Sequence, residues 1–429
     1  MMVLVLLVSF GVLLAVGAPV AFAMIVSGAA ALFAAHTFPL MIVVQRIAPG
    51  LDSFPLLAIP LFVLAGNLLN SSGIAQRIFD FASALVGHVK GGLAHVNVVA
   101  SMIFAGMSGV ASADAAGLGQ IELKQMRRAG YDVPFAAAIT AASSIIGPII
   151  PPSVIMVLYS VEASVPLTDM FLAGLLPGVL LGGFLMLAIF VLAHIGYINV
   201  PQEERANSRE AFRRFIRALP ALLAPIFLLA GLFLGIATPT ELGAIIALYA
   251  MVLGFVQGDL SWRDVLNALV STVRTCGVLV FIVAAAVPFG WIVAVAGVSN
   301  HFAEGVMAIT HSPWQVLLII NGILLIAGAF LETTALILIA IPVFLPTIEA
   351  IGVDPIHFGI ILILNVLVGA ITPPFGLILF VMMDVAKVGL RDMIKALMPF
   401  YLPLVALLIL LTLVPEISLL VPQLLGGLR

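Results

Sequence analysis

Gly147-Pro148-Ile149-Ile150-Pro151-Pro152 and Gly369-Ala370-Ile371-Thr372-Pro373-Pro374 decide the fold of this chain, and they stand 222 residues apart. Each stretch lies inside a long apolar segment, residues 134–161 for the first and 355–383 for the second. Proline lacks a backbone N–H and obstructs the preceding helical turn, so a Pro-Pro pair breaks a helix. Both segments are therefore predicted to be discontinuous helices that are unwound in the middle.

The composition around these stretches is that of a membrane protein. Of the 429 residues, 63% are hydrophobic and only 9% are charged, which is too little polar surface for a water-soluble globule of this size. Apolar runs of 18 residues or more recur, each long enough to cross about 30 Å of hydrocarbon. The prediction is an all-α integral membrane protein with about nine to twelve transmembrane segments, surrounded by lipid bilayer and without a nucleic-acid partner.

Hydropathy and helix breakers together place the membrane spans. The first, residues 2–34, is interpreted as one span broken near Gly17-Ala18-Pro19. The further spans are predicted at 56–70, 134–161, 168–198, 219–236, 240–257, 265–297, 355–383 and 396–413.

Two apolar segments, 92–118 and 314–346, do not read as simple spans. Small and polar residues interrupt them, at 108–114 in the first and at 328–334 in the second. We predict re-entrant helical hairpins, which are tolerated only where protein or a water-filled cavity surrounds the exposed backbone.

The matched breaks indicate two repeats. Lys124, Arg127 and Arg128 flank the loop before the first broken helix, whereas the loop before the second carries acidic residues, so the repeats are predicted to be inverted. The same charge bias predicts a cytoplasmic N-terminus and a periplasmic C-terminus. The expected organisation is a first repeat at 1–200, a cytoplasmic connecting arm at 201–217, linking spans at 218–257 and a second repeat at 258–429.

Unwound helices suggest an ion and substrate site. Free carbonyl oxygens are hard ligands that suit Na⁺, and half-helix N-termini favour a carboxylate. Gly and Pro alone also kink membrane helices, but two matched breaks, each preceded by a polar hairpin, favour a transporter site. The nearby hydroxyls are Ser108, Ser112, Ser143 and Ser144 in the first half and Thr333, Thr334 and Thr372 in the second.

Three charged residues lie at membrane depth. Asp114 and Glu332 sit in the two hairpins, where they either couple to an ion or serve as a protonated or hydrogen-bonded structural acid. Arg274 either grips a carboxylate, snorkels to the interface or pairs with Glu241. No nucleophile–base pairing or phosphate-binding loop accompanies them, so we expect no enzymatic activity and no cofactor.

Four segments together resemble the large membrane subunit of tripartite ATP-independent periplasmic (TRAP) transporters, within the ion transporter superfamily. They are residues 59–67, 147–153, 237–241 and 369–374. The resemblance implies Na⁺ symport of an organic acid, such as a C4-dicarboxylate or sialic acid, by an elevator-type motion in the bacterial inner membrane. It also implies a periplasmic substrate-binding protein and a small membrane subunit, here expected to be a separate chain.

The resemblance further implies two sodium sites, with sodium as the only metal. The first is Ser108, Gly109, Gly147, Ile150 and Pro152, and the second is Gly328, Thr333, Gly369, Thr372 and Pro374. Because Ile150 stands where Thr372 offers a hydroxyl, the two sites are not expected to be equivalent. Ser112, Asp114, Glu332 and Arg274 remain candidates for substrate contact or coupling.

Three other functions compete with this interpretation. A standalone Na⁺/carboxylate symporter of the same superfamily would need no binding protein. A channel is disfavoured because paired broken helices enclose an ion rather than letting it flow. An intramembrane enzyme would use Asp114, Glu332 or a histidine as its acid–base group, but the sequence shows no nucleophile–base pairing or metal signature for such chemistry.

Overall fold

A computed structural model describes residues 1–36, 38–198 and 205–426, and within these ranges the chain is helical, with no β-strand. Seven stretches are long and apolar enough to cross a bilayer. They are Phe54–Ser71, made of η1 (Phe54–Leu57) and α4 (Ala58–Ser71), and α11 (Leu167–His194), α12 (Ser208–Phe233), α13 (Pro239–Gln257), α14 (Trp262–Val295), α17 (Thr333–Ala350) and α20 (Leu390–Leu413). The prediction of an all-α membrane protein is confirmed.

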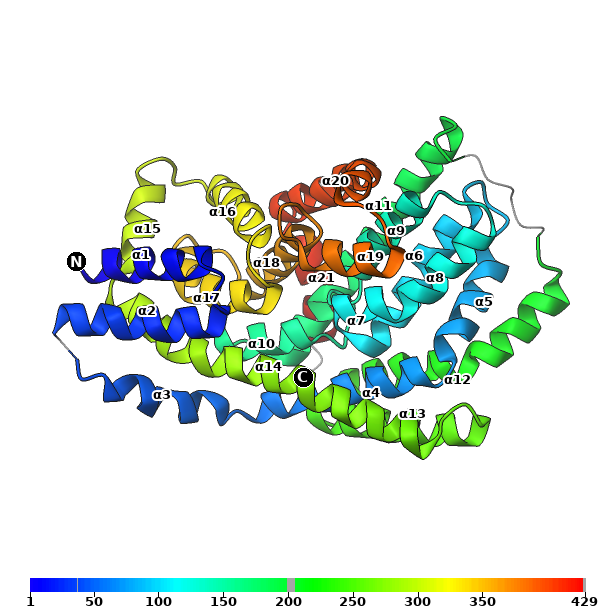
Figure 1. Ribbon diagram of the computed structural model, residues 1–429, viewed down its shortest axis with the longest axis horizontal. Helices are drawn as coiled ribbons and strands as arrows, with labels where there is room; N and C mark the ends of the chain where they lie inside the picture. Colours follow the sequence, from blue (N-terminus) through cyan, green and yellow to red (C-terminus); the bar gives the residue numbers. More distant parts are fainter. Residues whose placement is uncertain (37, 199–204, 427–429) are drawn as a thin grey trace.

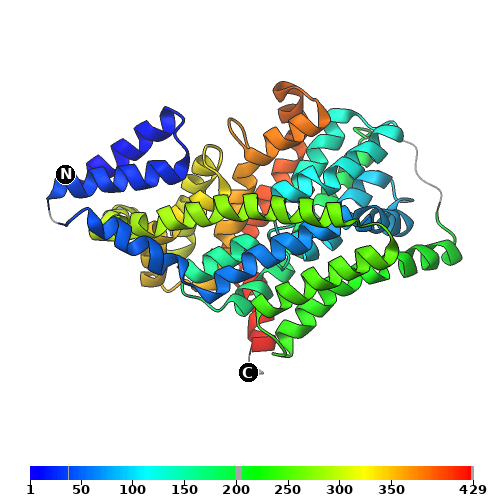
Figure 2. The ribbon, with the colours of Figure 1, turned by 60° about the horizontal axis from the view of Figure 1, so that its bottom comes forward.

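The N-terminal segment is a helical hairpin, so the prediction of one broken span over 2–34 is wrong. Helices α1 (Met2–Ala15) and α2 (Val20–Ala35) lie side by side and run in opposite directions (Figures 1 and 2). The chain reverses because Gly17 takes a positive φ of 86° after α1 and Pro19 stands directly before α2. Helix α3 (Met41–Leu51) follows and packs against α14.

Two sets of helices, one in each half, carry the predicted breaks. The first set is α6 (Gly92–Ser108), α7 (Ala111–Ala116), α8 (Leu118–Arg128), α9 (Val133–Ser144), α10 (Val154–Glu162) and α11; the second is α16 (Pro313–Gly328), α17, α18 (Pro355–Ala370), α19 (Leu377–Ala386), α20 and α21 (Glu416–Gly426). The gaps between α9 and α10 and between α18 and α19 contain the two Pro-Pro pairs, whose bonds are both cis. The two hairpins differ, because the first returns as two short helices and the second as the single helix α17.

Matched caps start the broken helices. Asp132 accepts a hydrogen bond from the backbone N–H of Phe135 at 3.3 Å, and Asp354 accepts one from Ile356 at 2.7 Å. Proline occupies the first turn of each helix, where its missing N–H costs no hydrogen bond within the helix. The matched stretches Gly130-Tyr131-Asp132 and Gly352-Val353-Asp354 thus mark two helix starts.

A long helix connects the parts of the molecule. Helix α14 spans 34 residues, roughly 50 Å at 1.5 Å per residue, and packs against α2, α3, α4 and α17 (Figure 2). Helix α15 (Val298–Met307) also contacts α14, whereas α13 packs against α4 and α12, and α12 packs against α5 (Ile74–Val86). Of the arm predicted at 201–217, residues 201–204 lie outside the described part of the chain, and residues 208–217 form the first turns of α12.

The contact between Gly359 and Tyr159 joins the two halves and gives a test of this fold. A Cβ atom on Gly359 of α18 would lie 2.5 Å from the ring of the fully buried Tyr159 of α10 and 2.8 Å from Met170. Gly359→Ala is expected to lower stability by about 1–3 kcal/mol, because a closely packed core resists added volume. Thermal unfolding of the purified protein in detergent measures this loss of stability.

Gly322→Ala in α16 is the matched control, since nothing lies within 4 Å of the Cβ it would add. Alanine is the better helix former, so the unfolding midpoint of this variant should stay or rise. Equal midpoints for the two variants would contradict the packing of α18 on α10.

Candidate functional site

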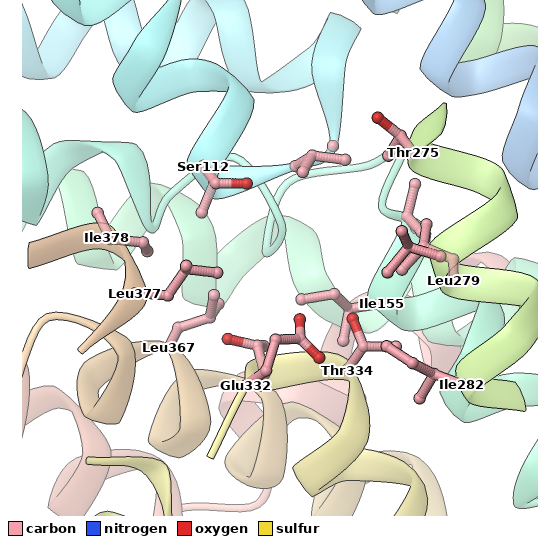
Figure 3. A pocket seen from close by; sticks show the side chains of 16 residues that line it. Ser112, Ile155, Thr275, Leu279, Ile282, Glu332, Thr334, Leu367, Leu377 and Ile378 are labelled. Carbon is pink, nitrogen blue, oxygen red and sulfur yellow. The ribbon is translucent and has the colours of Figure 1, made fainter. Parts of the chain in front are cut away.

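The tips of the two hairpins meet at one cavity of about 320 Å³, called here the tip cavity. Residues 109–112 of the first hairpin and 332–334 of the second line it, and Thr275, Leu279 and Ile282 of α14 close one side. Figure 3 shows Ser112 facing Glu332 and Thr334 across the cavity, with the α14 residues alongside. Two segments more than 200 residues apart are thus brought together.

Four helices begin at the tip cavity. Its lining includes the first two residues of each: Ala111 and Ser112 of the short α7, Val154 and Ile155 of α10, Thr333 and Thr334 of α17, and Leu377 and Ile378 of α19. The N-terminus of a helix carries partial positive charge from its unpaired N–H groups. This arrangement favours a negatively charged group in the cavity, although most side chains that line it are apolar.

The first hairpin tip is docked on the first helix break. Gly109 follows α6 with φ of 66°, and its carbonyl oxygen accepts a hydrogen bond from the N–H of Val154 at 3.4 Å. A Cβ on Gly109 would overlap the carbonyl oxygen of Pro152. Glycine is therefore required here both for the backbone conformation and for the close approach.

Asp114 connects the first tip to the break. It is 5% exposed, and its carboxylate accepts a hydrogen bond from the hydroxyl of Ser108. A Cβ on Gly147 would overlap the same carboxylate, so Gly147 leaves the room that Asp114 occupies. Asp114 also lines a second cavity of about 380 Å³, which shares Ser112 and Thr275 with the tip cavity.

The first break exposes backbone acceptors. No carbonyl oxygen of residues 147–152 accepts a hydrogen bond from the residues that the structure describes. The side chain of Ile150 packs instead against Gly178 of α11, so Ile150 has only its backbone to offer at this break. The arrangement presents carbonyl oxygens rather than side-chain ligands.

The second hairpin tip is docked in the same way. The carbonyl oxygen of Ala329 accepts a hydrogen bond from the N–H of Phe375 at 3.0 Å. A Cβ on Gly369 would lie 2.7 Å from backbone atoms of Gly328, so the two glycines let the hairpin touch the broken helix. Glu332 caps α17 by accepting from the N–H of Ala335 at 3.0 Å.

Thr372 contributes a hydroxyl to the second break. Its Oγ1 donates to the carbonyl oxygen of Val368 at 2.7 Å and also contacts the hydroxyl of Tyr401. Within the described chain, the carbonyl oxygens of Ala370, Pro373 and Pro374 accept no hydrogen bond. Thr333, at the other predicted position, is buried and lines the tip cavity.

Arg274 lies beside the tip cavity rather than in it. It is exposed on α14 and lines an adjacent cavity of about 540 Å³ together with Glu332. The alternative that Arg274 pairs with Glu241 is wrong: Glu241 accepts from the N–H and the hydroxyl of Thr238, both at 2.8 Å, and forms no ion pair with a described residue.

Sequence reasoning missed a buried acid. Glu122, 1% exposed, accepts from Nδ2 of Asn97 at 2.8 Å. Ser143, predicted to serve the first ion site, donates instead to Oδ1 of Asn97 at 2.6 Å. Helix α8 packs on α9 and points Glu122 inward. The available signal was Asn97 and Ser101, which share one face of an otherwise apolar helix.

The second half has a related cluster without a carboxylate. Asn365, 222 residues after Ser143, donates from Nδ2 to Oδ1 of Asn321 at 3.0 Å, and Asn321 donates to the hydroxyl of Thr412 at 2.8 Å. Each cluster joins the outer helix of a hairpin to the first part of a broken helix. The two halves therefore share a plan but differ in charge.

The sequence matches one protein family over residues 7–417, described as "Tripartite ATP-independent periplasmic transporter, DctM component". A Vibrio cholerae protein named a sialic acid TRAP transporter large permease protein is 41% identical, over 97% of this chain and 97% of its own length. A Pseudomonas aeruginosa protein named a C4-dicarboxylate TRAP transporter large permease protein is 39% identical, over 87% of this chain and 88% of its own length.

A solved structure has a similar fold. The YdaH transporter of Alcanivorax borkumensis matches with a TM-score of 0.61, over 87% of this chain and 88% of its own. At 17% identity the likeness concerns the fold alone.

The contact of Gly328 with Gly369 is directly testable. Gly369→Ala is expected to displace the second hairpin, because the atoms its Cβ would meet belong to rigid backbone. Residues 329–334 should then exchange their amide hydrogens faster, as measured by hydrogen exchange with mass spectrometry. Gly183→Ala in α11 is the control, because no atom lies within 4 Å of the Cβ that it would add. It should leave the exchange of residues 329–334 unchanged. Unchanged exchange in both variants would refute the docking of the tip.

Proposed function

The chain belongs to the DctM component family of tripartite ATP-independent periplasmic transporters, and on that basis we propose that it is the large permease subunit of a Na⁺-driven importer of an organic acid. The observation that carries the proposal is the tip cavity, where two hairpins, each backed by an unwound Pro-Pro segment, close on one space. Such paired interruptions are typical of secondary transporters. The chain is a multi-pass inner-membrane protein.

The coupling ion is proposed to bind behind each tip. Na⁺ is a hard cation that prefers oxygen ligands, which the free carbonyls of 147–152 offer at the first break. At the second break the ligands would include the hydroxyls of Thr333 and Thr372 beside backbone carbonyls. Because Ile150 has no hydroxyl, the first site depends on the backbone to a greater degree than the second.

The co-transported substrate is proposed to be a carboxylate held in the tip cavity. The N-termini of α10, α17 and α19 at this cavity supply partial positive charge. Ser112 and Thr334 offer hydroxyl donors from opposite sides. Relatives named for sialic acid and for C4-dicarboxylates fit this class of substrate.

An elevator-type motion is the proposed mechanism. The two hairpins and the two broken helices would move together as one transport domain past α14, which borders the tip cavity mainly with the apolar residues Val278, Leu279 and Ile282. An apolar border lets surfaces slide without breaking hydrogen bonds. A periplasmic binding protein would deliver the substrate, and a separate small membrane subunit would complete the assembly, with the N-terminus in the cytoplasm.

The sodium proposal predicts a specific effect of Thr372. Thr372→Val removes the hydroxyl oxygen but keeps the shape, so the Na⁺ concentration for half-maximal uptake should rise severalfold in proteoliposomes. Thr347→Val, also in the second half, is the control, because its buried hydroxyl has no partner in the described structure. An unchanged sodium dependence in Thr372→Val would count against the second site.

The partner proposal predicts what reconstitution requires. The chain, the small subunit, the binding protein and a Na⁺ gradient together should give uptake of labelled substrate, and omission of either partner should abolish it. Full uptake without the small subunit would refute the need for that partner. Full uptake without the binding protein would favour the standalone symporter instead.

A further inference from the structure

A second kind of cavity lies at the end of α12. Its volume is about 700 Å³, and the residues that line it belong to α5, to the first turns of α12 and to the end of α13. Four arginines line it, Arg77, Arg213, Arg214 and Arg217, against two carboxylates, Asp80 and Glu210. It shares no lining residue with the tip cavity. We call it the arginine cavity.

Two of the four arginines already have partners. Arg77 is held by Asp259 and Gln257. Arg214 donates to Glu210 at 2.6 Å and to the carbonyl oxygen of Asp80 at 3.2 Å. These contacts tie α12 to α5, and α5 to the end of α13, along one wall of the cavity.

The positive charges of the other two arginines are not neutralised by a close carboxylate of the described residues. The closest carboxylate to Arg213 among the described residues is Glu210, at 3.9 Å, and the Arg213 side chain is 64% exposed. Arg217 forms no ion pair or side-chain hydrogen bond with a described residue. Both also line a neighbouring cavity with Arg209. The local charge is therefore in positive excess.

The spacing of these residues places apolar side chains beside the charge. Arg209, Arg213 and Arg217 follow one another at four-residue intervals and so share one face of α12. Phe212 and Ile216, which are 65% and 47% exposed, lie on the neighbouring face. Because α12 continues as an apolar span, its first turns lie at the membrane–water boundary.

We propose that the arginine cavity binds the headgroup of an anionic phospholipid. The phosphodiester would accept hydrogen bonds from the guanidinium groups of Arg213 and Arg217, whose planar forks suit phosphate oxygens. The acyl chains would lie along Phe212 and Ile216. A free phosphate could accept the same hydrogen bonds from the arginines but has no acyl chains to lie along the apolar side chains. A basic pocket between helices at the membrane surface is typical of lipid recognition.

The test measures lipid binding to the purified full-length chain in mild detergent by native mass spectrometry. Short-chain phosphatidylglycerol should bind more tightly than phosphatidylcholine with the same acyl chains. Arg213→Gln combined with Arg217→Gln should weaken phosphatidylglycerol binding roughly tenfold or more. Arg127→Gln combined with Arg128→Gln is the matched control, since these exposed arginines of α8 line none of the cavities described here.

Arg217→Gln alone guards against misfolding, because Arg217 is exposed and forms no ion pair or side-chain hydrogen bond with a described residue. This variant should keep the unfolding midpoint and still weaken binding. Equal loss in the α8 control would overturn the assignment to the arginine cavity. Equal affinity for both lipids would overturn the proposal. Displacement of phosphatidylglycerol by inorganic phosphate at matched concentration would show that the site takes phosphate rather than lipid, and would overturn it too.

Discussion

Backbone polar groups inside a membrane need partners, and the rest of this structure depends on how the two Pro-Pro breaks meet that need. Each break interrupts the hydrogen bonds of a helix at membrane depth, where no bulk water replaces them. In the structure a hairpin tip covers each break: Gly109 accepts from Val154, and Ala329 accepts from Phe375. Each hairpin and each broken helix therefore stabilises the other.

The close approach that this docking needs is made possible by glycine. Gly109 lies against Pro152, and Gly328 lies against Gly369, so neither interface has room for a Cβ atom. Both tips are consequently held at one cavity, with four helix N-termini around it. The same contact that satisfies the backbone thus builds the proposed binding site.

The two halves use this plan with different chemistry. Asp114 accepts from Ser108 inside the first hairpin, whereas Glu332 caps a helix and faces two cavities. Behind the hairpins, a carboxylate completes the first polar cluster and a threonine completes the second. The inequality predicted from Ile150 and Thr372 therefore extends beyond those positions.

The sequence by itself determined the membrane class, the two breaks and the hairpins that precede them, because Pro-Pro pairs and apolar run lengths act through local backbone chemistry. Only the tertiary structure decided the rest. Residues 2–34 looked like one span because hydropathy records composition and not chain direction, which Gly17 reverses. The burial of Glu122 was not predicted, because its partner, Asn97, lies on another helix. The joining of Ser112 with Glu332 at one cavity likewise depends on packing between distant segments, which no local pattern encodes.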